Sequence, residues 1–241
     1  MELTQFDFFL WVIIPYLSLT IFVVGHIHRY NTDQYGWGAQ SSQFLQKDNL
    51  LKWGSRLFHY GVVFVFLGHV AGVLIPEGFY DVIGVTDHMY HFGATWFGGA
   101  AGVAMVIGGA LLTIRRLNSA RLKKHRSQMD VIVLLILGIV TVVGFTNTVG
   151  YTATGGTFDY RETVGPWFRG ILTFRPFPEL MAGAPLGFQL HILAAFLLFA
   201  IWPYTRLVHV WSLPLEYLSR KYLVYRKMNP KKAVKYAERK Q

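Results

Sequence analysis

A chain of 241 residues that is 53% hydrophobic and only 15% charged is not an ordinary soluble domain, in which about 25% of residues are charged. Its apolar runs of about 20 residues place it among integral membrane proteins. The formal net charge of +10 does not predict a nucleic-acid partner, because the basic residues lie between and after the apolar runs, as topology signals do.

The chain contains no cysteine. This excludes disulfides, thiolate-bound iron–sulfur clusters and a covalently attached CxxCH haem within the chain. Any iron that the chain holds must therefore be bound through histidine, methionine or oxygen ligands.

Five segments are long and apolar enough to cross a bilayer, and they predict an all-α integral membrane protein with a single domain over residues 1–241. In chain order they are Phe8–His26, Phe58–Ile75, Phe92–Ile114, Asp130–Val149 and Leu186–His209. We expect the first to be a retained span, because Glu2 and Asp7 stand where a cleaved signal would be basic. Pro15 and Pro203 fall inside two spans, where a membrane helix tolerates a kink.

The third segment is rich in glycine, which favours close helix packing, although small residues beside a flat cofactor are the alternative interpretation. Its glycines are Gly93, Gly98, Gly99, Gly102, Gly108 and Gly109.

The basic residues are unevenly distributed over the connecting segments. The loop after the first span, the loop after the third span, and the end of the fifth span with the tail that follows together hold 20 of the 23 Lys and Arg residues. The positive-inside rule therefore predicts that these segments are cytoplasmic, with the N-terminus outside and the C-terminus inside. Residues 210–241 would form a basic cytoplasmic tail that is solvated, touches lipid or docks a partner.

Four of the nine histidines lie in the second and fifth predicted spans, His59 and His69 in the second and His191 and His209 in the fifth. An imidazole is costly in hydrocarbon unless its polar atoms are satisfied. Because the two spans run in opposite directions, His59 should pair with His209 toward the inner face, and His69 with His191 toward the outer face. Each pair could supply the two axial nitrogens of a six-coordinate haem iron between helices two and five.

The spacing of these histidines supports the pairing only in part. The 18-residue gap in the fifth span is five full turns, so its histidines share a face, whereas the 10-residue gap in the second leaves its pair about 80° apart. The axial separations also differ, about 27 Å against about 15 Å. Tilt, a kink at Pro203 or haems set at an angle could reconcile them. Histidines that bond neighbouring helices, or a proton relay, remain alternatives, although Asp130 is the only acid near a span.

Four stretches of the sequence together resemble one known family, the gamma subunit of membrane-bound respiratory nitrate reductase, a b-type dihaem quinol oxidase. They are LFHYGVVFVFLGHVAGVLIP at 57–76, RLVHVWSLPLEYLSRKY at 206–222, RYNTDQYGWGAQSSQ at 29–43 and GGALLTIRRL at 108–117. The likeness covers nearly the whole chain.

The resemblance implies two haem b groups in the cell membrane, the inner one ligated by His59 and His209 and the outer one by His69 and His191. It implies that quinol is oxidised near the outer haem, in a pocket that includes Gly68 and His69. Electrons would then pass to the iron–sulfur clusters of a beta subunit and the molybdenum site of an alpha subunit, which reduces nitrate on the cytoplasmic side.

Some members of the family have a lysine in the loop after the second span, but residues 77–91 contain no Lys or Arg. His88, or else His91, is therefore the expected hydrogen-bond partner of quinol. Arg115 and Arg116 could equally pair with propionates of the inner haem or act only as topological anchors. Two other functions stay open. One is a dihaem anchor of another cytoplasmic reductase, of the heterodisulfide- or sulfite-reductase kind, and the other is a non-redox membrane anchor or transporter.

Overall fold

The computed structural model describes residues 4–33, 36–38, 48–119, 127–152, 155 and 158–212, and these residues form helices and no β-strand. Five helical segments are long and apolar enough to cross a membrane. They are Gln5–Thr32, Asn49–Leu74, Asp87–Asn118, Gln128–Gly150 and Leu186–Tyr204. The predicted all-α fold with five spans is confirmed, and the protein is a multi-pass membrane protein.

Several spans combine an α-helix with a short 3₁₀- or π-helical segment. The first is built from α1 (Gln5–Phe8), the π-helix η1 (Phe9–Ile13) and α2 (Ile14–Thr32); the second from α3 (Asn49–His69) and the π-helix η3 (Val70–Leu74). The third is α5 (Asp87–Asn118), and the fourth is α7 (Gln128–Thr146), followed by η4 (Asn147–Thr152). The fifth contains α10 (Leu186–Ile201) and the 3₁₀-helix η5 (Trp202–Tyr204). Short helices α4 (Glu77–Val82), α8 (Val164–Leu172) and α9 (Glu179–Ala182) lie in the connections.

Side-chain caps explain where three of the spans begin. Asp48, Thr86 and Ser127 each accept a hydrogen bond from the backbone N–H three residues later, which satisfies one of the free donors of a helix N-terminus. The Asp130 carboxylate in turn accepts a hydrogen bond from the backbone N–H of Ser127, which completes a capping box. With these caps, α3 and α5 extend well beyond their apolar segments.

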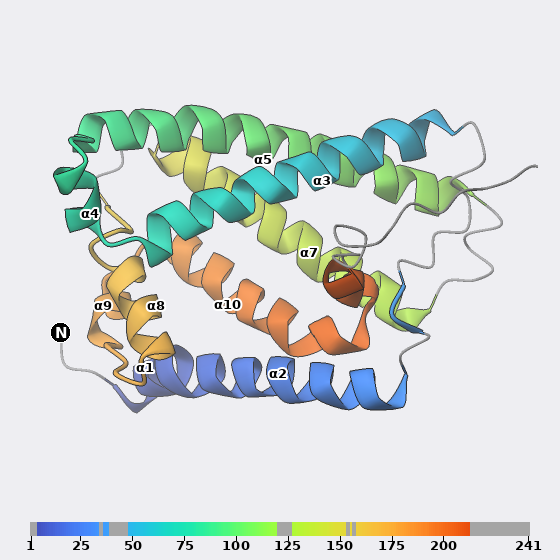
Figure 1. The fold of residues 1–241 in the computed structure, drawn as a ribbon, viewed down its shortest axis with the longest axis horizontal. Coiled ribbons are helices and arrows are strands. Elements are labelled where there is room, and N and C mark those ends of the chain that lie inside the picture. Colours follow the sequence, from blue (N-terminus) through green and yellow to red (C-terminus); the bar gives the residue numbers. More distant parts are fainter. Residues whose placement is uncertain are drawn as a thin grey trace, which may run out of the picture. The chain divides into compact units, whose positions relative to one another are not determined.

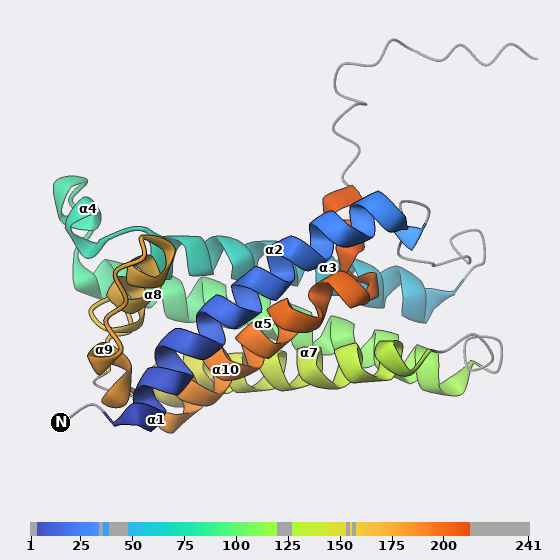
Figure 2. The same ribbon diagram turned by 90° about the horizontal axis from the view of Figure 1, so that it is seen from below.

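Helix α5 packs against both α3 and α7, and α10 packs against both α7 and α2, so the five spans form one connected bundle. Helices α3 and α5 lie side by side, while α10 packs against α2 and α7 (Figure 1, Figure 2). A Cβ atom at Gly61 would lie 2.7 Å from the Met105 nitrogen, and one at Gly108 would lie 2.9 Å from the Gly54 oxygen. Glycine therefore lets the backbones of α3 and α5 touch, and close helix packing is confirmed as its role at Gly108.

A buried aromatic cluster fixes α8 to the start of the first span. Pro15 has no N–H to donate to the Trp11 carbonyl, and the indole nitrogen of Trp167 donates to that carbonyl at 3.0 Å instead. The two tryptophan rings meet edge to face at 5.9 Å, and each residue is 1% exposed. The cluster consists of Trp11, Val164, Trp167, Ile171, Met181, Ala184 and Phe196.

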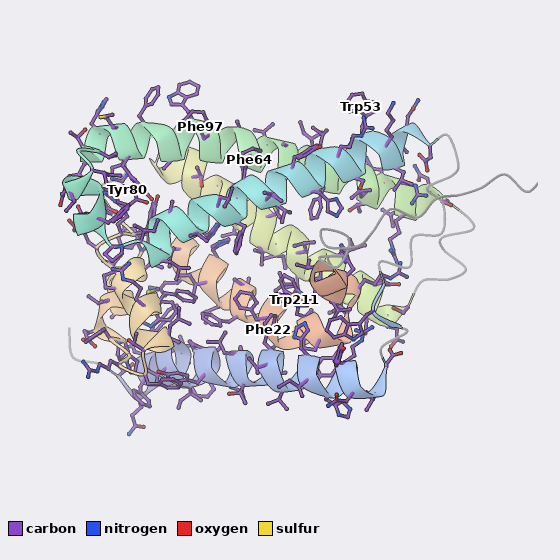
Figure 3. The ribbon with its side chains drawn as sticks, viewed as in Figure 1. Phe22, Trp53, Phe64, Tyr80, Phe97 and Trp211 are labelled. Atoms are coloured by element: carbon purple, nitrogen blue, oxygen red, sulfur yellow. The ribbon has the colours of Figure 1, made fainter. Side chains whose placement is uncertain are left out.

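Large apolar side chains cover the outward face of the α3–α5 pair. Trp53, Phe64 and Phe97 are exposed, Phe97 to 78%, and Figure 3 shows Trp53 on the edge that faces away from α2. A soluble protein rarely leaves such a surface uncovered, whereas lipid chains cover it in a bilayer.

The fifth span differs from its prediction. Helix α10 ends at Ile201, the 3₁₀ turn η5 follows, and Thr205 is extended before a second 3₁₀-helix, η6 (Arg206–Ser212), begins. Pro203 cannot continue an α-helix, because it has no N–H and its ring clashes with the preceding turn. The predicted span Leu186–His209, in which a kink at Pro203 was expected to be tolerated, is therefore broken at Pro203, and His209 does not lie on the helix that carries His191.

The chain divides into two units, Met1–His209 and Val210–Gln241. Of the second unit the structure describes only residues 210–212, so the predicted basic tail lies almost wholly outside the described residues. The predicted sides of the two termini remain predictions.

Candidate functional site

The four histidines singled out in the sequence form two pairs. The ring centroids of His59 and His209 are 6.2 Å apart, and those of His69 and His191 are 5.9 Å apart. These are the two pairs expected from an antiparallel arrangement of spans two and five. Their role as iron ligands remains a prediction.

All four histidines make the same kind of hydrogen bond through Nδ1. The accepting backbone carbonyls belong to Ser55 for His59 (2.7 Å), Val65 for His69 (2.8 Å), Val140 for His191 (3.1 Å) and Arg206 for His209 (2.6 Å). Because a carbonyl oxygen only accepts, Nδ1 must carry the proton, and Nε2 of each neutral ring keeps a lone pair. Metal-ligating histidines are typically oriented by such a bond from the other ring nitrogen.

The centroid separation of each pair matches that expected for one metal ion bound between two Nε2 atoms. An imidazole nitrogen lies about 2 Å from a first-row metal ion, and the ring centre about 1 Å further, so two rings on opposite sides have centres about 6 Å apart. Within the described residues, no hydrogen bond reaches any of the four Nε2 atoms, and no group of three or more His, Asp or Glu side chains gathers as a metal site. A metal ion held by one pair would therefore need its remaining ligands from a cofactor, as the macrocycle of haem supplies them.

Different elements position the two histidines of the fifth span. His191 lies against α7, where a Cβ atom at Gly144 would be 2.7 Å from its Cε1 atom and where the Val140 carbonyl accepts its proton. His209 is placed by the break at Pro203. An unbroken helix would place His209 about 27 Å along the axis from His191, far more than the axial separation of about 15 Å between His59 and His69 on α3. Because α10 ends at Ile201 and His209 lies on η6, this separation for an unbroken helix does not apply to His209.

Arg115 and Arg116 have carboxylate partners within the protein. Arg115 pairs with Asp48 (2.5 Å) and Arg116 with Asp130 (2.6 Å). The hydrogen bond from Arg115 lowers the pKa of Asp48. These ion pairs anchor the end of α5, and the predicted contact of the two arginines with haem propionates remains a prediction.

The residues predicted to bind quinol are spread over the other end of the bundle. A Cβ atom at Gly68 would have no neighbour within 4 Å, and His88 is exposed on the first turn of α5. His91 is engaged, since its Nε2 lies 3.0 Å from an Asp159 oxygen and 3.2 Å from Nη2 of Arg161. Among the described residues, neither His88 nor His91 forms a hydrogen bond or ring contact with His69, and their role in quinol binding remains a prediction.

A buried ion cluster at this end escaped the sequence reasoning. The Arg161 side chain is 2% exposed, pairs with Asp159 (2.6 Å) and Asp87 (3.0 Å), and lies over the Tyr90 ring at 4.4 Å. Burial works against ionisation of Asp159, but its hydrogen bonds with Arg161 prevail and lower its pKa. The partners of Arg161 on α5 are some 70 residues away in the chain, so no local sequence pattern predicts the cluster.

Two tyrosines link this end of the bundle to the turn that follows His69. The hydroxyl groups of Tyr90 and Tyr160 are 3.2 Å apart, and burial raises the pKa of Tyr160. A Cβ atom at Gly72 would lie 2.7 Å from Cε2 of Tyr160 and 2.7 Å from the hydroxyl oxygen of Tyr90. Only glycine therefore lets η3 pack against them.

Comparison with known proteins agrees with this architecture. Residues 7–228 match the family described as nitrate reductase gamma subunit. The nitrate reductase gamma chain of Bacillus subtilis is 50% identical over 218 residues, which cover 90% of this chain and 97% of that protein. The respiratory nitrate reductase 2 gamma chain of Escherichia coli is 36% identical over 90% of this chain and 96% of its own length. The nitrate reductase-like protein NarX of Mycobacterium tuberculosis is 39% identical, over 33% of its length. The chain therefore belongs to the nitrate reductase gamma subunit family.

Proposed function

We propose that this chain is the membrane cytochrome b subunit of a respiratory nitrate reductase, which oxidises quinol near the outer face of the cell membrane and passes the electrons through two bis-histidine haems b. The observation that carries the proposal is the shared geometry of the four histidines. Each has Nδ1 bonded to a carbonyl, and the rings are paired at 5.9 and 6.2 Å.

The four histidines would act mainly by keeping both axial positions of each haem iron occupied. A haem with both axial positions filled exchanges one electron and binds no further ligand. The carbonyl partners keep each histidine in the Nδ1–H tautomer, so that Nε2 is ready to ligate without losing a proton. His59 and His69 are exposed in the structure, so the bilayer around the spans would have to keep water from the two pairs.

The proposed direction of electron transfer follows from the predicted topology. Quinol would be oxidised beside the outer pair, in a pocket with Gly68, His69, His88 and His91, and would release its two protons outside. Its electrons would move inward to the His59–His209 pair. An elementary charge that crosses 100 mV corresponds to about 2.3 kcal/mol, so this separation of charge generates membrane potential without a proton pump.

The proposed partners lie at the inner end of the bundle. The names of the relatives, gamma chains of nitrate reductases, imply other subunits. We assign to them an iron–sulfur beta subunit and a molybdenum alpha subunit that reduces nitrate in the cytoplasm. They would dock on the loop around residues 30–56 and on the basic tail, which lie largely outside the described residues.

A visible spectrum of the purified complex tests the proposal. Reduction with dithionite should show b-type absorbance from two haems per chain, and a short-chain quinol should reduce both. A chain that binds no haem would contradict the proposal and favour the non-redox anchor. If haem is present, co-purification with a large molybdenum subunit would support a nitrate reductase, and another cytoplasmic reductase in its place would contradict it.

A further inference from the structure

The break between α10 and η6 is held from outside by Arg29, at the end of α2. Nη1 of Arg29 donates to the carbonyl of Pro203 (2.6 Å) and to that of Thr205 (2.8 Å). One turn earlier on α2, a Cβ atom at Gly25 would lie 2.8 Å from the Pro203 ring, so α2 lies directly against the break. Arg29 thus replaces the donors that a continuing helix would have offered to these carbonyls.

The residue that follows the break is held by a second element. Asp130, at the start of α7, accepts hydrogen bonds from Nε (2.5 Å) and Nη2 (2.8 Å) of Arg206. Asp130 also pairs with Arg116 at 2.6 Å, and its side chain is only 4% exposed. A buried carboxylate between two guanidinium groups is costly to neutralise, because both cations then lose their partner.

These contacts lead directly to one histidine of the inner pair. The carbonyl of Arg206 accepts the Nδ1 proton of His209 at 2.6 Å, so the orientation of His209 depends on where Arg206 lies. The opposite ring needs no such support, because His59 bonds to the Ser55 carbonyl one turn earlier on the same continuous α-helix. His209 lies on a short 3₁₀ segment after a bend, where the local backbone alone does not define its place.

We propose that Arg29 and Asp130 are positioning residues for His209, which hold the Pro203–Arg206 segment on both sides and thereby set the inner histidine pair. This inference rests on the proposed function, since it concerns how firmly that pair retains haem. Neither residue need touch the haem itself.

The test compares Arg29→Gln and Asp130→Asn with the wild-type complex. Each change should weaken retention of the inner haem by about 10- to 100-fold, the usual effect of removing a residue that orients a metal ligand. The inner haem should also change its midpoint potential and its low-spin EPR signal, while the outer haem keeps both. Arg29→Lys should rescue in part, because one ammonium group can reach a carbonyl. Matched controls are Arg175→Gln and Asp81→Asn, which remove the same charges at exposed positions of the outer connections.

Two outcomes would overturn the proposal. One is an inner haem with unchanged content, potential and EPR signal in both variants. The other is equal loss of both haems, which would mean that Arg29 and Asp130 support the fold as a whole.

A measurement on haem-free protein separates this inference from the proposed function. The chain has no native cysteine, so Tyr60→Cys and Tyr204→Cys, both at exposed positions, can carry one spin label each. Arg29→Gln should broaden the distance distribution between the labels, and an unchanged distribution would contradict the positioning role. A wild-type complex without haem would contradict only the proposed function.

Discussion

At the scale of single residues, each paired histidine is oriented by its own hydrogen bond. The four accepting carbonyls belong to four different turns of the backbone, on α3, on α7 and in η6. Because the two pairs share no side chain or acceptor, the inner and outer sites should respond independently to substitution.

Replacement of one histidine should therefore remove one haem. In His209→Ala or His59→Ala, about half of the haem per chain should be lost, because a single axial imidazole retains the group poorly. The outer haem should remain reducible by quinol, as measured by the quinol-reduced minus oxidised spectrum. His191→Ala or His69→Ala should instead abolish reduction by quinol.

Phe199→Ala, on α10 but outside both pairs, is the control for general damage to the fifth span. Retention of both haems at wild-type content after any of the four histidine changes would contradict the assignment of that histidine.

Gly144 should be important for the outer pair alone. In Gly144→Ala the new methyl group would lie 2.7 Å from Cε1 of His191, so the ring must move away from its present position. We expect weaker retention of the outer haem and a shifted potential, measured by redox titration of the absorbance.

The matched control for this change is Gly138→Ala on the same helix, where an added Cβ would have no neighbour within 4 Å. Equal behaviour of the two variants would show that the approach of Gly144 to His191 is unimportant for the outer site.

At the scale of elements, the two prolines inside the spans have opposite effects. Pro15 lies at the start of α2, follows a π-helix, and leaves one carbonyl for Trp167 to satisfy, so the span continues. Pro203 ends α10, and Arg29 satisfies carbonyls at the break. In the sequence both prolines simply lie in apolar runs. Whether the helix continues past each proline depends on which hydrogen-bond donors of other elements reach the carbonyls near it.

The contact between α3 and α5 should be the packing interface most sensitive to an added methyl group. Gly61→Ala and Gly108→Ala each place a Cβ within 3.0 Å of backbone atoms of the facing helix, which cannot move aside as a side chain can. Such overpacking typically costs about 1–3 kcal/mol, which thermal inactivation of the detergent-solubilised complex should reveal.

Gly109→Ala is the control on the same helix, because its added Cβ would be 3.7 Å from the nearest atom, an ordinary contact. A thermal midpoint in Gly61→Ala and Gly108→Ala equal to that of Gly109→Ala would contradict the backbone contact.

At the scale of the whole molecule, the arginines predicted to be cytoplasmic form their described ion pairs at one end of the bundle. Arg115, Arg116 and Arg206 pair with Asp48 or Asp130, and Arg29 reaches the break in the fifth span. Arg161 forms its own cluster with residues of the predicted outer connections. The two ends of the bundle are thus chemically different, and which end faces the cytoplasm remains a prediction from the positive-inside rule.

The absence of cysteine from the sequence allows a direct test of orientation. Val82 lies in a predicted outer connection and is 85% exposed, so Val82→Cys should react with a membrane-impermeant maleimide in intact cells. Asn118→Cys, at the C-terminal end of α5 on the predicted cytoplasmic side, should react only in inverted vesicles. The reverse pattern would show that the predicted topology is inverted.

Much of this architecture could be predicted from the sequence because it depends on one-dimensional properties. The number of spans follows from the length of apolar runs, and the pairing of His59 with His209 follows from their order along antiparallel spans. The ends of the spans were less well predicted. Helix α3 begins at Asn49 instead of Phe58, since a cap at Asp48 lets the helix continue through polar residues.

The sequence by itself determined the membrane class, the five spans, the family likeness and the histidines that form pairs. Only the tertiary structure decided how a 10-residue gap on one span can face an 18-residue gap on another. The answer is the break at Pro203, which Arg29 and Asp130 hold from other helices. The physical reason is that a proline shows where a helix can end, while the direction of the chain beyond it depends on which distant donors and acceptors satisfy the freed backbone and its side chains.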